Sequence, residues 1–404
     1  MRRSPLIFIF ITVLVDMLGY GMVLPLLPFY VLQQEGGALA VGLLGSLYAV
    51  MQMFSGPVLG GLSDRYGRRP VLLLCLAGTS LAFILLGLAN TLQLVFLAVM
   101  LDGITGGNLT TAYAYIADIT SAEERSQGMS LVGAAYGLGM IAGPAAGGLL
   151  SAYGLAVPAF AAAAVALINV LFGFFVLPES LPKDKRVKAI HWKGFHLVAQ
   201  LGSLPRLGAS RLLLAAIFSL NLAFVGLQTN FPLFSQARFD WGSLKNGIFF
   251  AFVGVSAVFV QGVLYRRIHR RLGERRLARI GLGLMAAGLV GGVLSPVDWL
   301  LFPCIGLVVM GSGISIPSIT GLLSRAVEAG AQGRLMGGMQ ALLSLTAIIG
   351  PATAGLVFAQ ISIYAPYLLG AALVLLALGL VSLWNPREPQ NEVVQTSAVP
   401  VQEP

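Results

Sequence analysis

Long apolar stretches separated by short polar turns dominate the chain. Each stretch has about the 20 residues that a helix needs to cross the hydrocarbon core of a membrane. The stretches are too long for the strands of a membrane barrel, and polar and apolar residues do not alternate along them. We predict twelve membrane helices, over residues 5–31, 39–62, 70–89, 92–117, 126–150, 156–177, 211–235, 245–266, 277–296, 299–322, 334–359 and 364–385.

The composition supports a membrane protein. Hydrophobic residues make up 57% of the 404 residues and charged residues only 10%, whereas a soluble domain has roughly 25% charged residues. We therefore predict an all-α, multi-pass membrane protein. Asp16 interrupts the first apolar run and no cleavage site follows, which argues against a cleaved signal peptide. Both cysteines lie inside apolar stretches, so we expect no disulfide framework, no metal site and no cofactor.

The positions of the basic residues predict how the chain is oriented. Of the 25 lysines and arginines, only Arg238 and Lys245 fall on one side of the predicted membrane, and all others fall on the opposite side. Basic loops are retained in the cytoplasm. We therefore expect both termini and the stretch 178–210 to be cytoplasmic. The net charge of +9 reflects this topology, so we expect no nucleic-acid partner.

The two halves of the chain are related in sequence. A shift of 206 positions aligns Gly67 with Gly273, and a shift of 207 aligns Gly143 with Gly350. Parallel repeats of six helices place a substrate site near the membrane midplane, between the halves. We predict an N-terminal bundle over 1–177, a cytoplasmic linker over 178–210, a C-terminal bundle over 211–385 and a disordered cytoplasmic tail over 386–404.

The turn between the second and third predicted helices is rich in charge and reads GGLSDRYGRR over residues 60–69. Arginines alone would anchor the turn at the membrane surface, but they do not explain the aspartate beside them or the flanking glycines. The pattern resembles the signature loop of the major facilitator superfamily of secondary transporters. That resemblance implies two pseudo-symmetric six-helix bundles. It also implies a conformational latch made of Gly60, Asp64, Arg65, Gly67, Arg68, Arg69 and Asp118.

The latch hypothesis makes two predictions about contacts. A carboxylate is stabilised at the positive N-terminal end of a helix, so we expect Asp64 to cap the helix predicted at 334–359. We also expect Arg68 to pair with Asp118, at the end of the fourth helix. These contacts would hold the two halves together when the transporter opens outward.

The fifth predicted helix carries a second pattern, GMIAGPAAGG. Glycines four residues apart share a face and let another helix approach closely, and a proline bends the helix. Ordinary close packing would also account for such glycines. The pattern resembles the signature of proton-coupled exporters in the superfamily, in which helix 5 packs against helix 8. The resemblance assigns this signature to Gly139, Gly143, Pro144, Gly147 and Gly148.

The segment from Asp102 to Arg125 resembles the fourth helix of tetracycline-resistance-type drug/proton antiporters. Gly103, Ile104 and Thr105 carry part of that likeness. The family often has an arginine four residues before this Gly-Ile-Thr, where the chain has Val99. The acidic and histidine residues of related helices 8 and 9 are also absent. Tetracycline itself is therefore not the expected substrate.

Two carboxylates lie within the apolar helices. A charged aspartate at the bilayer centre costs roughly 2.5–3.5 kcal/mol, and burial favours the protonated form of a carboxyl group. Asp16 and Asp102 are therefore candidate proton carriers. The alternative is that polar neighbours such as Tyr20 or Thr105 hold them permanently. Candidate substrate-cavity residues, which could also serve helix packing, are Tyr20, Asn108, Tyr113, Tyr136, Gln228, Asn230, Gln261 and Gln340.

These patterns predict a proton-coupled antiporter that exports small amphipathic compounds across the cytoplasmic membrane. We expect it to act as a monomer, with protons, the small-molecule substrate and the lipid bilayer as its partners. A facilitator or importer of a small metabolite is an alternative on the same fold. An integral-membrane enzyme is less well supported, because the sequence has no metal cluster, nucleophile elbow or phosphate loop. The sequence offers no test for a transport-inactive scaffold.

Overall fold

The computed structural model describes residues 3–121, 124–187, 211–327 and 331–385. These residues form helices and turns without strands, and twelve helical segments among them are long and apolar enough to cross a membrane. Their ends fall within four residues of the predicted spans. The predicted fold class is thereby confirmed. Most of the predicted linker and the predicted tail, residues 188–210 and 386–404, lie outside the described residues.

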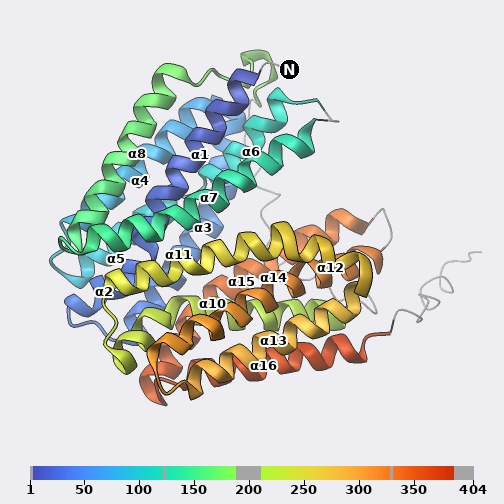
Figure 1. Cartoon of the computed structure of the whole chain (residues 1–404). Coiled ribbons are helices and arrows are strands. Elements are labelled where there is room, and N and C mark those ends of the chain that lie inside the picture. The colour runs from blue at the N-terminus through green and yellow to red at the C-terminus, as the bar shows by residue number, and fades with distance from the viewer. Residues whose placement is uncertain (1–2, 122–123, 188–210, 328–330, 386–404) are drawn as a thin grey trace, which may run out of the picture.

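The first six spans form one group of helices (Figure 1). α1 packs between α7 and α8, and α4 packs against α8 and α5. The elements are α1 (Arg3–Val23), the 3-10 turn η1 (Leu24–Leu26), α2 (Leu27–Gln33), α3 (Ala38–Tyr66), α4 (Arg68–Gly87), α5 (Leu92–Thr105), α6 (Asn108–Ile119), α7 (Arg125–Ser151) and α8 (Ala156–Val176). A short turn, η2 (Lys183–Lys185), follows.

The last six spans form the second group. α13 packs against α14 and α16, and α10 packs against α15 and α16. An aromatic cluster fills part of this core, where the rings of Phe231 and Phe249 stack with centroids 4.0 Å apart. The elements are α10 (Arg211–Phe239), α11 (Ser243–Phe259), the π-helical turn η5 (Val260–Leu264), α12 (Tyr265–Leu272), α13 (Glu274–Leu294), η6 (Asp298–Leu300), α14 (Leu301–Arg325), α15 (Gln332–Gln360) and α16 (Ala365–Leu383).

The two groups meet mainly through two pairs of helices, α3 with α15 and α7 with α11, and α10 adds smaller contacts with α2 and α3. Glycines allow the close approach: a Cβ at Gly148 would lie 2.7 Å from the Cα of Gly247. The Ser46 hydroxyl also donates a hydrogen bond of 2.5 Å to the carbonyl oxygen of Ile348. Ser46 lies early in α3 and Gly148 lies late in α7, so these contacts are at the end of the molecule away from the arginine-rich turns.

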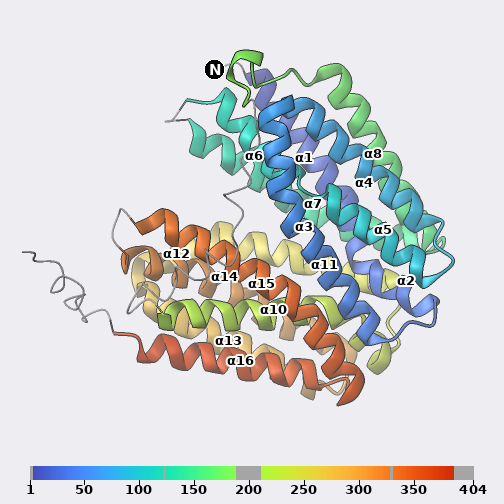
Figure 2. The same cartoon turned by 180° about the vertical axis from the view of Figure 1, so that it is seen from behind.

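The ribbons of the two groups diverge toward the other end, where the N-terminus and α12 lie. Figure 1 and the reverse view in Figure 2 agree on this arrangement. The signature turn between α3 and α4 is at this end. The two groups of helices are therefore in contact at one end of the molecule and separated at the arginine-rich end.

Three spans that the sequence predicts as continuous helices change their helical geometry or are interrupted, and one of them is the eighth, which contains the π-helical turn η5. The first changes to a 3-10 turn at Leu24–Leu26, where Pro25 cannot donate a backbone hydrogen bond. The fourth is divided between α5 and α6 at Gly106 and Gly107, because adjacent glycines are poor helix formers. The break in the fourth span lies between the candidate residues Asp102 and Asn108.

Candidate functional site

The signature turn is built around a glycine and a buried arginine. Gly67 has a φ of +109°, a conformation that residues with a side chain rarely adopt. The chain then enters α4 at Arg68, which is only 8% exposed. Its guanidinium pairs with Asp118 (Nε to Oδ2, 3.0 Å) and with Asp64 (Nη1 to Oδ1, 2.5 Å). The expected pair of Arg68 and Asp118 is present.

The expected cap of α15 by Asp64 belongs to the outward-open state, so it stays a prediction. In this conformation the Asp64 carboxylate pairs with Arg68 in its own turn rather than with α15. The physical reason is the separation of the two halves at this end, which keeps the first turn of α15 away from α3 (Figure 2). Of the other latch residues, Arg69 donates to the carbonyl oxygen of Phe174, and Arg65 is exposed. A Cβ at Gly60 would meet no atom within 4 Å, so close packing does not account for this glycine.

The first residues of the predicted linker bind to the same turn, which the sequence did not indicate. Glu179 accepts hydrogen bonds from the backbone N–H of Arg68 (2.8 Å) and of Leu181 (3.1 Å). The Ser180 hydroxyl donates to Asp118 over 3.1 Å. Glu179 therefore neutralises the N-terminal end of α4. No local signal could have identified it, because it lies 111 residues from Arg68 along the chain.

Asp16 is buried in the middle of α1, at 6% exposure. Its Oδ2 accepts a hydrogen bond of 2.5 Å from the side-chain amide of Asn108. Its Oδ1 has no hydrogen-bond partner among the described residues, and neither does the hydroxyl of Thr12, one helical turn earlier. Both residues line a cavity of about 10 Å³, which is close to the room that one water molecule needs. One carboxylate oxygen of Asp16 is therefore held and the other is free to take a proton.

Asp102 lies one turn before the break between α5 and α6, and it is partly buried. It is close enough to Asp16 for the two charges to interact, and the hydroxyl of Thr79 lies near its carboxylate. The Thr79 hydroxyl also lies 3.4 Å from that of Thr105. The two aspartates that the sequence singled out separately are thus brought together by α1, α4 and α5.

A tyrosine pair borders the two carboxylates. The rings of Tyr20 and Tyr48 stack with centroids 5.6 Å apart, and the side-chain amide of Gln52 donates to the Tyr48 hydroxyl over 3.3 Å. We call Asp16, Asp102, Tyr20, Tyr48 and Gln52 the polar cluster. Sequence reasoning missed Tyr48. The spacing of four residues between Tyr48 and the polar Gln52 in an apolar helix was the available signal.

The glycines of the antiporter signature divide between two neighbours. α7 packs against α11, as the resemblance implied, through Gly148. Gly139, Gly143 and Gly147 instead face α1 in the same half: a Cβ at Gly143 would lie 2.7 Å from the Cα of Gly21. Pro144 also borders both Gly21 and Gly247. The signature therefore fixes α1, which carries Asp16, against α7 as well as joining the halves.

The other candidate cavity residues are placed differently. Tyr136 is 42% exposed and lies near enough to Tyr20 to interact with it, and Tyr113 is partly buried. Asn230 is fully buried and its amide has no hydrogen-bond partner among the described residues, so it lines no accessible surface in this conformation. The three other candidate amides of the second half, Gln228, Gln261 and Gln340, are exposed.

The charges within the spans are distributed unevenly. Every basic residue of the described spans lies within about two turns of the end of a span, whereas Asp16 and Asp102 lie in the middle of their spans. The described residues contain no group of three or more His, Cys, Asp or Glu side chains able to hold a metal ion. Within the described residues, the charged side chains in the middle of the membrane spans are therefore carboxylates.

The fold and the site together define a polytopic secondary transporter, with paired helical bundles and a polar centre in the first bundle. The chain belongs to the Major Facilitator Superfamily, whose family profile matches residues 9–272 and 267–403. It is a multi-pass protein of the cytoplasmic membrane.

Individual relatives agree with this assignment. The class C tetracycline resistance protein of Escherichia coli is 34% identical over 93% of this chain and 96% of its own length. Multidrug resistance protein 2 of Bacillus subtilis is 28% identical, with 96% of each protein covered. The crystal structure of the human organic anion transporter MFSD10 is 27% identical and superposes with a TM-score of 0.68, covering 94% of this chain and 99% of that one. The predicted resemblance to the drug-efflux transporters of the major facilitator superfamily is thereby confirmed.

Proposed function

We propose that the protein is a proton-coupled antiporter that exports small amphipathic compounds across the cytoplasmic membrane. The observation that carries this proposal is the pair of interior carboxylates, Asp16 and Asp102, within the polar cluster. A buried carboxyl group can bind a proton from one side of a membrane and release it to the other as its hydration changes. The tetracycline and multidrug resistance proteins among the relatives support drug efflux as the direction and class of transport.

The charge of the interior favours cationic or neutral substrates over anions. Asp16 and Asp102 have no basic side chain near them in the described spans, so the first half presents negative charge in a medium of low dielectric constant. A proton and a cationic compound then compete for the same carboxylates, which links export to proton entry. Tyr20 and Tyr48 add aromatic faces that attract cations.

The positive-inside distribution supports a cytoplasmic position for both termini and the signature turn. With that orientation, the separated end of the structure opens toward the cytoplasm, from which an exporter takes its substrate. When the halves close at this end, Asp64 is carried toward the N-terminal end of α15. The network of Asp64, Arg68 and Asp118 then acts as the latch of the outward-open state.

A facilitator is the second candidate function. The hydrogen bond from Asn108 to Asp16 favours it, because an aspartate that is held by an amide can be structural. A facilitator equilibrates its substrate, whereas an antiporter accumulates it against a gradient.

A growth-inhibition screen in an exporter-deficient host, with organic cations, neutral compounds and organic anions in the panel, first identifies a substrate. Inside-out vesicles that contain the protein are then given an acidic lumen. The proposal predicts that the substrate accumulates in the lumen and that an uncoupler abolishes the accumulation. Uptake that only reaches equilibrium, with or without the proton gradient, would replace the antiporter with the facilitator.

A further inference from the structure

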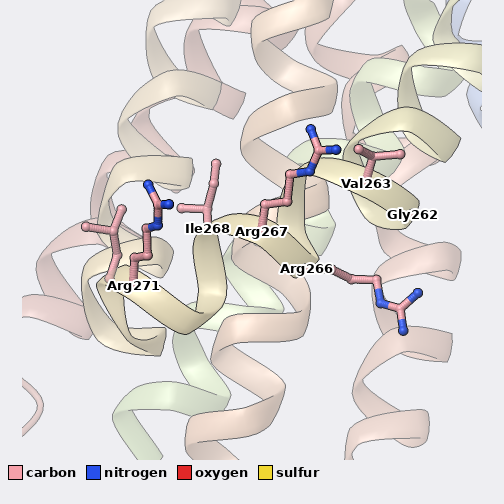
Figure 3. Close-up of a pocket in the computed structure, with 7 residues that line it drawn as sticks. Gly262, Val263, Arg266, Arg267, Ile268 and Arg271 are labelled. Atoms are coloured by element: carbon pink, nitrogen blue, oxygen red, sulfur yellow. The ribbon is translucent and has the colours of Figure 1, made fainter.

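An arginine-rich helix follows the eighth membrane span. α11 continues through the π-helical turn η5 into α12, which reads YRRIHRRL. In Figure 3, the side chains of Arg267 and Arg271 extend to the same side of the helix with Ile268 between them, and Arg266 extends from another flank. All three arginines are exposed. They surround a hollow of about 930 Å³, which Val263, Ile268 and Leu272 also line.

The described chain provides no negative charge for this hollow. No carboxylate of the described residues pairs with Arg266, Arg267 or Arg271. The nearby Glu274 is already engaged, because it pairs with Arg325 and lies 3.3 Å from the imidazole of His269. Its side chain is only 9% exposed. Three like charges therefore gather at one surface, and an external anion would relieve their repulsion.

The hollow lies where α11 leaves the apolar region. Along α11, large apolar side chains are exposed at intervals of four and three residues, at Ile248, Phe252, Val255 and Phe259. This spacing places them on one face of the helix. That face leads to Val263 and then to the arginines. An apolar wall that ends in paired guanidinium groups matches the acyl chains and the phosphodiester of a phospholipid.

We propose that the hollow at α12 binds an anionic glycerophospholipid. Arg267 and Arg271 donate hydrogen bonds to its phosphodiester oxygens, since guanidinium groups bind phosphate through two donors at once. Arg266 adds positive charge, and Val263 with the exposed face of α11 contacts an acyl chain. Inorganic phosphate shares the charge but has no acyl chain, so it would leave the apolar wall uncovered. This site is independent of the proposed proton coupling.

The test measures lipid binding to the purified full-length chain in detergent by native mass spectrometry. Phosphatidylglycerol is titrated as the anionic lipid and phosphatidylcholine as the zwitterionic one. The double variant Arg267→Gln/Arg271→Gln should bind phosphatidylglycerol roughly 25-fold more weakly, about fivefold for each arginine, which corresponds to about 1 kcal/mol per basic residue. The matched control Arg276→Gln/Arg279→Gln removes two exposed arginines of α13 outside the hollow and should bind as the wild type does.

Three results would overturn the proposal. One is equal binding of the two lipids to the wild type. Another is an equal loss in the control variant, which would make the effect a general one of net charge. The third is displacement of phosphatidylglycerol by millimolar inorganic phosphate, which would indicate a free-anion site. If the glutamine variant does not fold, Arg267→Lys/Arg271→Lys replaces it. That variant should show an intermediate loss, because lysine keeps the charge but not the two-donor geometry, and unchanged affinity would contradict the proposal.

Discussion

The turn after α3 and the turn after α12 occupy corresponding places in the two halves. Their arginines differ, because Arg68 of the first turn is buried and paired whereas Arg267 and Arg271 beside the second are exposed. Both turns pass through a glycine of positive φ, +109° at Gly67 and +71° at Gly273. In the first turn Arg68 is buried against two carboxylates. In the second, Arg267 and Arg271 face outward without a carboxylate among the described residues. The repeat has kept the backbone turn, but the buried arginine with two carboxylates is found in the first half, whereas in the second half the carboxylate of Glu274, whose side chain is 9% exposed, pairs with Arg325.

The membrane-spanning parts of the two halves also differ in their polar and charged side chains. The first half holds Asp16 and Asp102 beside stacked tyrosines, and the second half holds an aromatic core around Phe231 and Phe249. A duplicated scaffold therefore supports two specialised halves. We infer that the first half carries the coupling chemistry and the latch, and that the second contributes packing and a membrane-facing charged surface.

The largest effect is expected from removing the buried arginine of the first turn. Arg68→Gln leaves Asp64 and Asp118 without their common partner, and breaking a buried ion pair costs about 3 kcal/mol or more. We expect transport to be lost and the thermal unfolding temperature of the purified protein to fall. The exposed Arg276 of the second turn provides the control, because Arg276→Gln should change stability by less than about 0.5 kcal/mol. Equal stability of the two variants would remove the contrast between the turns.

A smaller effect is expected where glycines allow helices to touch. Gly143→Leu should inactivate the transporter, because its Cβ would lie 2.7 Å from the Cα of Gly21 and overpacking costs roughly 1–3 kcal/mol. A Cβ at Gly137, in the same helix, would meet no atom within 4 Å, so Gly137→Leu should transport normally. Transport assays and expression levels of the two variants check this. An active Gly143→Leu would show that α1 and α7 are not in tight contact.

The two glycine turns provide a more graded comparison. Alanine at either Gly67 or Gly273 is strained by roughly 1–3 kcal/mol, because their backbone conformation is nearly restricted to glycine. At Gly67 the added methyl group also collides with the Glu179 carboxylate, whereas at Gly273 it meets open space. We expect Gly67→Ala to lower the unfolding temperature more than Gly273→Ala does. The reverse order would contradict the described position of Glu179.

The smallest effect is expected from Glu179 itself. Glu179→Ala removes an acceptor for the backbone N–H of Arg68 and the ion pair with Arg186 (3.5 Å), and such a charged hydrogen bond contributes about 1.5–3 kcal/mol at most. Because the carboxylate is partly exposed, we expect the free energy of unfolding to fall by about 1 kcal/mol. Asp184→Ala, an exposed change in the same segment, should be neutral. Denaturation of both variants in detergent would measure the difference.

The sequence predicted the spans because long apolar runs allow few other structures. It also predicted the Arg68–Asp118 pair, through the resemblance of the turn. It missed the breaks in the first and fourth helices, since proline and glycine occur in continuous membrane helices too. It missed Glu179, whose partner is remote in the chain. It named Asn230 as a candidate cavity residue, although this side chain is fully buried in the present conformation. The cap of α15 by Asp64 stays a prediction, because a sequence does not specify which conformation the halves adopt.

The central claim is that Asp16 and Asp102 couple transport to protons. The most direct test compares uphill accumulation with substrate counterflow in proteoliposomes that contain Asp16→Asn, Asp102→Asn or both. Asparagine keeps the shape of aspartate but cannot titrate, so the account predicts that at least one single variant and the double variant lose uphill transport and substrate-induced proton release while counterflow persists. If all three variants still accumulate substrate with the pH dependence of the wild type, these carboxylates do not carry the proton.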